Sequence, residues 1–300
     1  MKRTAERATC WAVLREVEHS PGRETDDAAI LRAVGARLEE ADSGWKVEYR
    51  SPAGITGRED VLPVMAFSMC EGSAALGSLQ RWEGRGVRVV NSARSVVNTH
   101  RECALPLLDA ARVPVPESRV LDSADPSIPE DPALYSSCWV KQATEHKTRE
   151  GDVVFATDAR AVAEALEMLR ARKLPRAVVQ RHLDGDLVKF YGVGSGAGIG
   201  TSSEGGETAG PSWFRWFHPR EHPPAGHAFD ADAMRDIAWR AAGALGLEVW
   251  GGDAIVTREG AIFVIDVNAW PSFALYRDEA ADHIAAHLAA RLKRVARVAV

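Results

Sequence analysis

The chain has 300 residues, of which 46% are hydrophobic and 26% charged, so it can form a sizeable globular core. Its net charge of −5, with no basic stripe to offset it, argues against non-specific nucleic-acid binding. No apolar h-region follows the first residues and there is no run of 18 apolar residues, so we expect neither a signal peptide nor a membrane span. Four scattered cysteines without a CxxC pair indicate reduced thiols in a cytoplasmic protein.

Short apolar strands alternate with helical patterns in the first third of the chain. Such alternation is typical of a parallel sheet, so we predict an α/β domain over residues 1–94. A helix over 95–111 and the rigid segment Val113-Pro114-Val115-Pro116 then form a linker over 95–116. Strands of the first domain are predicted near 10–17, 45–49, 61–69 and 87–90.

Two further regions follow the linker. The central region, 117–183, has predicted strands at its start, middle and end and an amphipathic helix over 158–171. The last region, 184–300, contains a strand over 187–193, a Gly/Ser/Thr-rich stretch over 194–210 and further strands and helices. Its remaining elements are predicted at 213–217, from Asp230, at 249–256, at 261–267 and at 278–297.

The most informative pattern is a hairpin that carries two carboxylates. The apolar strands 249–256 and 261–267 are joined by a short polar turn ending in Gly, which places Asp253 almost opposite Asp266. Asn268 lies two residues further on and therefore points to the same face as Asp266. Three oxygen ligands on one face suit Mg²⁺. The alternative is a solvated hairpin edge with incidental acids, but strands this apolar favour burial.

Two lysines lie inside apolar strands. Lys141 ends the strand 137–141, and Lys189 lies between Val188 and Phe190. A lysine in a buried strand is unfavourable unless its ammonium meets an anion, although snorkelling from an edge strand is the simpler alternative. Together with a magnesium site, the two lysines indicate a polyphosphate held from opposite sides.

Other known patterns are absent or incomplete. The chain has no Walker-type phosphate loop and no protein-kinase motif set. Residues 192–197 fit GxGxxA after a strand, but a dinucleotide site needs a helix directly afterwards, and the polar stretch 201–210 cannot supply one. His218, His222 and His227 are interrupted by prolines and are better explained as a solvated loop than as a zinc site.

The order of these features resembles the ATP-grasp superfamily. The resemblance rests on Asn91-Ser92, on Trp139-Val140-Lys141, on 178–186, and on the spacing of Asp253 from Asp266 and Asn268. It is weak over residues 1–90 and strong after 135. It implies an α/β fold of α+β subdomains: an N-terminal parallel-sheet domain, a central lid domain and a C-terminal antiparallel-sheet domain.

The resemblance also implies roles for individual residues around an ATP held between the last two domains. Lys141 would contact the α- and β-phosphates, Lys189 the adenine or phosphate side, and the segment Gln180-Arg181-His182-Leu183 would present its backbone to adenine. The remaining implied contacts are Asp186 to the ribose, Arg101 to the nucleotide from the linker helix, Arg215 to the transferring phosphate, Lys147 to the phosphates from the lid loop, and Asp253, Asp266 and Asn268 to Mg²⁺. Many members have Glu where Gln180 and Asp266 stand, and their glycine-rich lid loop is replaced here by residues 143–148.

We therefore expect an ATP- and Mg²⁺-dependent carboxylate–amine (or carboxylate–thiol) ligase that works through an acyl phosphate, with two metal ions and Mn²⁺ as an alternative metal. The partners would be a small carboxylate and a small amine, with no nucleic acid and no membrane, and the chain could form a homodimer. A kinase of the same superfamily, resembling the inositol phosphate kinases, is the main competing hypothesis and would need a basic acceptor pocket. Two further hypotheses are a non-catalytic nucleotide-binding module and a purely structural α/β protein. Candidate polar groups near the acceptor are Glu16, Arg23, Ser73, Ser272 and Tyr276.

Overall fold

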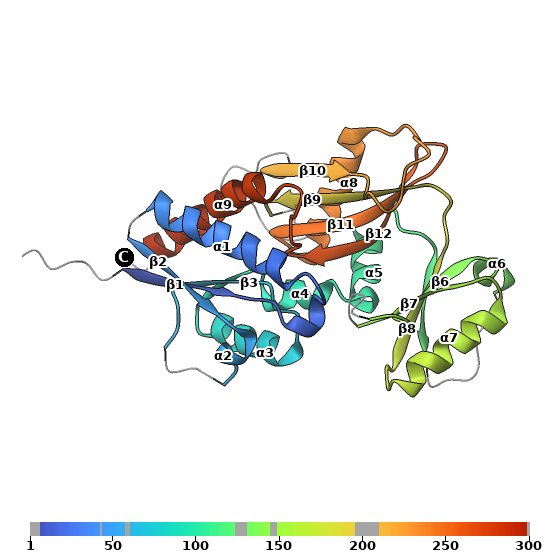
Figure 1. The fold of residues 1–300 in the computed structure, drawn as a ribbon, viewed down its shortest axis with the longest axis horizontal. Helices are drawn as coiled ribbons and strands as arrows, with labels where there is room; N and C mark the ends of the chain where they lie inside the picture. Colours follow the sequence, from blue (N-terminus) through green and yellow to red (C-terminus); the bar gives the residue numbers. More distant parts are fainter. Residues whose placement is uncertain are drawn as a thin grey trace, which may run out of the picture.

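The computed structural model describes residues 7–42, 44–57, 61–123, 131–144, 149–195 and 210–298. In these residues the strands form three four-stranded sheets that follow one another along the chain (Figure 1). We call the parts built on them the N-terminal, central and C-terminal units. The predicted fold class, with one parallel sheet followed by two antiparallel sheets, is confirmed.

The N-terminal unit is a parallel sheet with the strand order β2-β1-β3-β4. Its central strands β1 and β3 are short and almost wholly buried, as the apolar runs predict. Because neighbouring parallel strands leave the sheet at the same edge, the loops after β1 and β3 lie together there. The elements are β1 (Ala8–Val13), η1 (Val17–His19), α1 (Glu24–Ala41), β2 (Trp45–Arg50), α2 (Pro52–Ile55), β3 (Met65–Ser68), α3 (Ser73–Gly84) and β4 (Arg88–Val90).

The predicted linker helix is two helices, α4 (Ala93–Asn98) and α5 (Arg101–Ala110), so the single helix over 95–111 is wrong. Thr99 still has helical backbone, and its hydroxyl donates to the carbonyl of Val96 at 2.7 Å. The break lies at His100, whose backbone is extended (φ −57°, ψ 131°). The second helix then begins at Arg101, whose side chain is buried. Because of this break, Arg101 points in a different direction from the one it would have on a continuous helix.

The central unit has an antiparallel sheet with the order β5-β8-β6-β7. Helix α7 covers it and is N-capped by Asp158, which accepts from the amide of Ala161 at 2.8 Å. Strand β7 was not predicted, because four residues between polar turns give too short a pattern. The elements are β5 (Ser118–Asp122), α6 (Pro132–Tyr135), β6 (Cys138–Gln142), β7 (Val153–Ala156), α7 (Ala159–Ala171) and β8 (Arg176–Arg181).

The C-terminal unit has an antiparallel sheet with the order β10-β9-β11-β12. Helix α8 packs on this sheet, while α9 lies beside α1 of the N-terminal unit (Figure 1). The elements are β9 (Asp186–Val193), β10 (Trp213–Phe217), α8 (Ala231–Leu245), β11 (Val249–Val256), β12 (Ile262–Ala269) and α9 (Arg277–Val298).

The N- and C-terminal units share their hydrophobic cores, whereas the central unit has a core of its own. Phe67 of β3, for example, stacks on Trp270 after β12, with 5.9 Å between ring centroids. Figure 1 shows the central unit standing apart from this joint body. None of the described helices is both long and apolar enough to cross a membrane. Of the four cysteines, Cys10, Cys70 and Cys138 are buried, Cys103 is half-buried, and all are free thiols.

Candidate functional site

Asp253 and Asp266 are register partners across the β11–β12 ladder, as the hairpin pattern predicted. Asn268 pairs with Gly251 one step along the same face, and the ladder shifts register just beyond Asp253. The three oxygen-bearing side chains therefore lie on one face of the sheet. The glycines beside Asp253 permit this close packing: a Cβ on Gly252 would lie 2.4 Å from the carbonyl oxygen of Asp266.

A cation accompanies each carboxylate. Lys189 of β9 donates to both carboxylate oxygens of Asp253, at 2.8 and 3.0 Å. Arg101 of α5 contacts Asp266 at 3.2 Å and also donates to the carbonyl of Gln142 at 3.0 Å. Burial raises the pKa of Asp253 above its ordinary value, while the neighbouring charge of Lys189 acts in the opposite direction.

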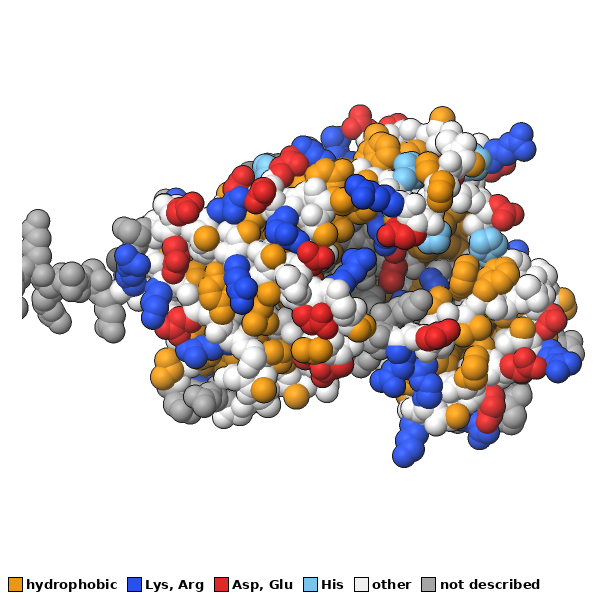
Figure 2. Space-filling model, viewed as in Figure 1, with side chains coloured by type: hydrophobic (Ala, Val, Ile, Leu, Met, Phe, Trp, Pro, Cys, Tyr) orange, Lys and Arg blue, Asp and Glu red, His pale blue; other side chains and the backbone are white. Residues whose placement is uncertain are grey.

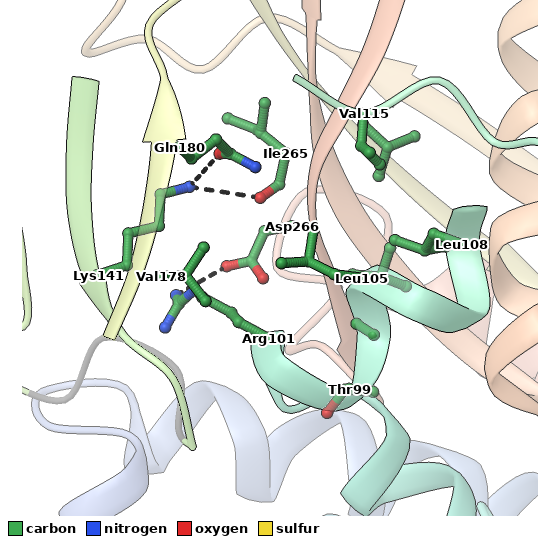
Figure 3. A pocket seen from close by; sticks show the side chains of 13 residues that line it. Thr99, Arg101, Leu105, Leu108, Val115, Lys141, Val178, Gln180, Ile265 and Asp266 are labelled. Carbon is green, nitrogen blue, oxygen red and sulfur yellow. Dashed lines mark hydrogen bonds and ion pairs between the residues drawn. The ribbon is translucent and has the colours of Figure 1, made fainter. Parts of the chain in front are cut away.

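Lys141 reaches the same region from the central unit. Its ammonium donates to the side-chain oxygen of Gln180 at 2.7 Å and lies 3.4 Å from the carbonyl oxygen of Ile265 (Figure 3). Burial lowers the pKa of Lys141 to about 8, and the charge of Asp266 opposes this shift. The snorkelling alternative is thus excluded for Lys141, which is buried.

These groups line an inner pocket between the central and C-terminal units. Lys141, Arg101 and Asp266 point toward one another from β6, α5 and β12, and apolar side chains complete the walls (Figure 3). One end is therefore charged and the other apolar. The pocket has a volume of only about 30 Å³, so a ligand with a flat apolar group attached to an anion would fit only if the central unit moved away from the C-terminal unit. The apolar lining comes from Ala104, Leu105, Leu108, Val115, Val178, Val264, Ile265 and Val267.

A second hollow, which we call the open cleft, lies on the other side of Asp253 and has a volume of about 480 Å³. All of its lining residues belong to the N- and C-terminal units, so the open cleft lies within the joint body. The molecular surface is also hollowed between the central unit and this joint body (Figure 2). We call the sheet face with the three predicted ligands Asp253, Asp266 and Asn268 the metal-ligand face. It borders both hollows, because Asp253 and Asn268 line the open cleft and Asp266 lines the inner pocket. Loops after β1, β3, β10 and β12 supply other lining residues, among them Arg15, Arg23, Glu71, Arg220, Glu221, Pro271 and Ser272. Helices and strands supply His19, Asp27, Tyr191 and Phe217.

The segment predicted to read adenine lies at the end of β8, between the two units. Gln180 is buried, and its amide nitrogen donates to Ser118 at 3.2 Å. The backbone amides of Arg181 and His182 donate to the carbonyls of Glu117 and Ser137 at 2.8 and 2.9 Å. Because these two amides already have hydrogen-bond partners, an adenine bound at this segment would need hydrogen bonds from other backbone groups, including those of Leu183.

Two of the predicted site residues, Asp186 and Arg215, do not lie with the groups that line the inner pocket and the open cleft. Asp186 accepts from the backbone amides of Ala225, Gly226 and His227 at 2.6, 2.9 and 2.7 Å, and it lies on the face of β9 opposite Lys189. Arg215 forms an ion pair with Glu279 and lies over the ring of Trp213, outside the lining of the open cleft. Asp186 thus anchors a loop, and Arg215 ties β10 to α9.

Several other predictions have simple outcomes. Lys147 lies outside the described residues, as does most of the 194–210 stretch. Of the acceptor candidates, Arg23 and Ser272 line the open cleft, whereas both carboxylate oxygens of Glu16 accept from the amides of Glu71 and Gly72 at 3.0 and 3.1 Å.

Arg15 is the main site residue that the sequence did not reveal. It lines the open cleft and contacts Asp27, Glu71 and the carbonyl of Trp270. Nothing in the pattern around residue 15 points to a partner more than 250 positions away. A long-range contact of this kind has no local sequence signal.

The donor set fits Mg²⁺ bound together with phosphate oxygens. Across the described ranges, no group of three or more His, Cys, Asp and Glu side chains could hold a metal alone. Two carboxylates and one amide oxygen are too few for a self-sufficient octahedral site, but Mg²⁺ in phosphoryl-transfer enzymes uses one or two carboxylates and substrate phosphates. Hard oxygen donors also make zinc or copper a poor match.

Comparison with solved structures shows that this protein has the ATP-grasp fold. An ATP-grasp protein of the RimK domain type from Sphaerobacter thermophilus has 19% sequence identity and a TM-score of 0.61, with 92% of this chain and 98% of that chain covered. A D-alanine–D-alanine ligase from Bacillus anthracis, solved in complex with ATP, has 12% identity and a TM-score of 0.66, with coverages of 97% and 98%. The ATP-grasp ligase PsnB, solved with a minimal precursor, has 18% identity and a TM-score of 0.59, with coverages of 97% and 99%. Neither protein-family models nor curated protein sequences gave a match.

Proposed function

We propose that this protein is an ATP- and Mg²⁺-dependent carboxylate–amine ligase. The observation that carries the proposal is one face of the β11–β12 hairpin with Asp253, Asp266 and Asn268, flanked by Lys141, Arg101 and Lys189. Three cations and a magnesium ligand set around two carboxylates suit a nucleoside triphosphate. The compared ligase that was solved with ATP supports the same nucleotide for this chain.

Once the central unit moves away and widens the inner pocket, the nucleotide would lie with its base in the apolar part of this pocket and its phosphates toward Asp266. Lys141 and Arg101 would then meet the phosphate oxygens from the central and linker elements. Asp253, Asp266 and Asn268 would hold one or two Mg²⁺ ions, which neutralise the β- and γ-phosphates and orient the γ-phosphoryl group for in-line transfer. Because the central unit has a separate core, it can move as a lid over the nucleotide.

The carboxylate substrate would bind in the open cleft, where its oxygen can face the γ-phosphorus. In the first step a carboxylate oxygen takes the γ-phosphoryl group, and the bond to ADP breaks. In the second step the amine nitrogen attacks the acyl carbon, phosphate leaves, and the nitrogen loses a proton. The chain needs to supply position, charge and exclusion of water rather than a nucleophile, which agrees with the absence of a catalytic triad motif.

The charge of the open cleft favours the ligase over the kinase alternative. Its described lining contains four basic residues, Arg15, Arg23, Lys189 and Arg220, and four acidic ones, Asp27, Glu71, Asp253 and Glu221. A polyphosphorylated polyol would require a clear excess of positive charge. A balanced cleft is better suited to a small acid and an amine.

The test is ³¹P NMR of the full chain with Mg²⁺, ATP and pooled small carboxylates, amines and polyols. The proposal predicts ADP and inorganic phosphate only when an acid and an amine are both present. A new phosphoester resonance without free phosphate would show a kinase instead. Mixtures that leave ATP intact, although ATP binds, would contradict the ligase proposal.

A further inference from the structure

Lys189 and Asp253 form a pair in which one ammonium contacts both carboxylate oxygens. The distances are 2.8 and 3.0 Å, and the residues are register partners on β9 and β11. A divalent cation bound by Asp253 would use lone pairs of the same two oxygens. Lys189 and the metal therefore compete for one carboxylate.

The two cations of the site differ in how firmly they are held. Arg101 has a buried side chain, 8% exposed, and is also fixed by the carbonyl of Gln142. Lys189 has a side chain that is 35% exposed, and in the described part of the chain it has no hydrogen-bond acceptor other than Asp253. A lysine has a flexible stem and one compact charge, so it can leave a carboxylate more easily than a fixed guanidinium can.

The open cleft provides space for the side chain of Lys189 when it leaves Asp253. Lys189 lines this cleft together with Asn268 and Gly252, on the side away from the inner pocket. An ammonium released from Asp253 would remain beside the metal ligands but would face the space assigned to the acceptor. At that position it would lie on the acceptor side of the transferring phosphoryl group, opposite Lys141.

We propose that Lys189 is a metal-displaced cation: it holds Asp253 until a divalent ion binds, then turns into the open cleft and neutralises charge that develops between the γ-phosphate and the acceptor oxygen. The catalytic half of this inference, in which Lys189 neutralises the developing charge, rests on the proposed function. The competition for Asp253 stands on the geometry alone. Binding of the metal ion would thus be coupled to the movement of the Lys189 ammonium into the open cleft.

Substitutions of Lys189 separate this role from a merely structural one. Lys189→Met removes the competitor, so Mn²⁺ should bind roughly three- to tenfold more tightly, while turnover falls at least tenfold. Lys189→Arg keeps the charge but offers a fork that fits a carboxylate bidentately, so Mn²⁺ should bind more weakly than in the wild type. The expected order of affinity is Met, then Lys, then Arg, which long-range repulsion alone cannot produce because Lys and Arg carry equal charge.

The experiment is a titration of the full chain with Mn²⁺ in the presence of ADP, with free Mn²⁺ followed by electron paramagnetic resonance. Lys46→Met is the control, since Lys46 is exposed and pairs with Glu48 at 2.7 Å on β2. Thermal unfolding with and without Mn²⁺ gives a second readout. Without Mn²⁺, the Lys189→Met variant has one cation fewer beside the neighbouring carboxylates of Asp253 and Asp266. Mn²⁺ should therefore stabilise this variant more than it stabilises the wild type.

The outcomes are distinguishable. An unchanged Mn²⁺ affinity in Lys189→Met, or an equal affinity in the Met and Arg variants, would overturn the metal-displaced cation. A wild-type chain that binds no Mn²⁺ with ADP would instead contradict the proposed function itself. The expected order of affinities combined with full turnover in Lys189→Met would overturn the catalytic half of the inference.

Discussion

The guanidinium of Arg15 donates to the carbonyl oxygen of Trp270 at 2.7 Å and so joins the segment after β1 to the loop after β12. The same side chain donates to Asp27 at 2.9 Å and forms an ion pair with Glu71. Trp270 adopts the left-handed region at φ 44°, and its ring packs on Phe67. These contacts fix the loop that carries Pro271 and Ser272 into the open cleft.

Replacing Arg15 with lysine should therefore impair the acceptor more than the nucleotide. A lysine keeps the charge but cannot direct donors to three partners at once, so we expect the KM of the acceptor to rise about tenfold with the KM of ATP unchanged. Steady-state kinetics with each substrate varied would measure this. Arg37→Lys is the control, since Arg37 pairs with Asp278 and Asp282 on the outside of α9. An equal rise in both KM values would show that Arg15 does not act through the acceptor side.

Asp266→Asn should abolish turnover and leave the fold intact. The amide is nearly isosteric but carries no charge to bind a divalent ion, and it weakens the contact with Arg101 at 3.2 Å. Turnover and far-UV circular dichroism of the variant would be compared with those of Asp184→Asn, a change at an exposed residue. Turnover by the Asp266→Asn variant near the wild-type rate would show that Asp266 is not a metal ligand.

The placement of Asp253, Asp266 and Asn268 on one face of the hairpin could be predicted because it depends only on local rules. The period of two in a strand and a short turn place Asp253 opposite Asp266 and put Asn268 on the same face. The same rule explains why Asp186 was misplaced: it is three residues from Lys189 on β9, so the two must point to opposite faces. The ribose contact of Asp186 was implied by the family resemblance alone, whereas strand alternation places Asp186 on the other face of β9.

Other features could not be predicted, because they depend on packing between distant segments. Arg215 alternates like a site residue on β10, but its partner Glu279 lies on α9, more than sixty positions away. The break between α4 and α5 also lies at the extended backbone of His100, which hydrophobic periodicity does not indicate. Such contacts decide which of several candidate arginines reaches the site.

Glu248 should make the fold sensitive to acid. Burial raises the pKa of this carboxyl, but the hydrogen bond with His287 and the charges of Arg88 and Arg291 outweigh burial and lower it to about 2, from an ordinary value of 4.5. The bonds to His287 and Arg291 measure 2.7 and 2.8 Å. Since the carboxyl binds a proton more weakly in the folded protein, its stabilisation is complete above pH 4.5 and is lost as the pH falls toward 2.

Glu248→Gln should therefore lower the free energy of unfolding at neutral pH by about 3 kcal/mol. The difference between variant and wild type should shrink between pH 4.5 and 2, because the wild-type carboxyl becomes protonated there. Urea unfolding across this pH range measures both effects. Glu164→Gln, on the exposed face of α7, serves as the control and should show neither effect. A difference that stays constant with pH would mean that the carboxylate charge is not the cause.

Gly252→Ala should disrupt the metal-ligand face through backbone crowding alone. The added Cβ would lie 2.4 Å from the carbonyl oxygen of Asp266 and 2.5 Å from the ring of Phe190, and backbone cannot yield as a flexible side chain does. We expect a loss of about 1–3 kcal/mol in stability and strongly weakened Mn²⁺ binding, because Asp266 must shift. Gly84→Ala, at the end of α3 with no atom within 4 Å of the added Cβ, should instead be neutral or stabilising by up to about 1 kcal/mol. Chemical unfolding and Mn²⁺ titration of both variants would decide, and a Gly252→Ala protein with wild-type metal affinity would show that the ligand face tolerates a shift of its backbone.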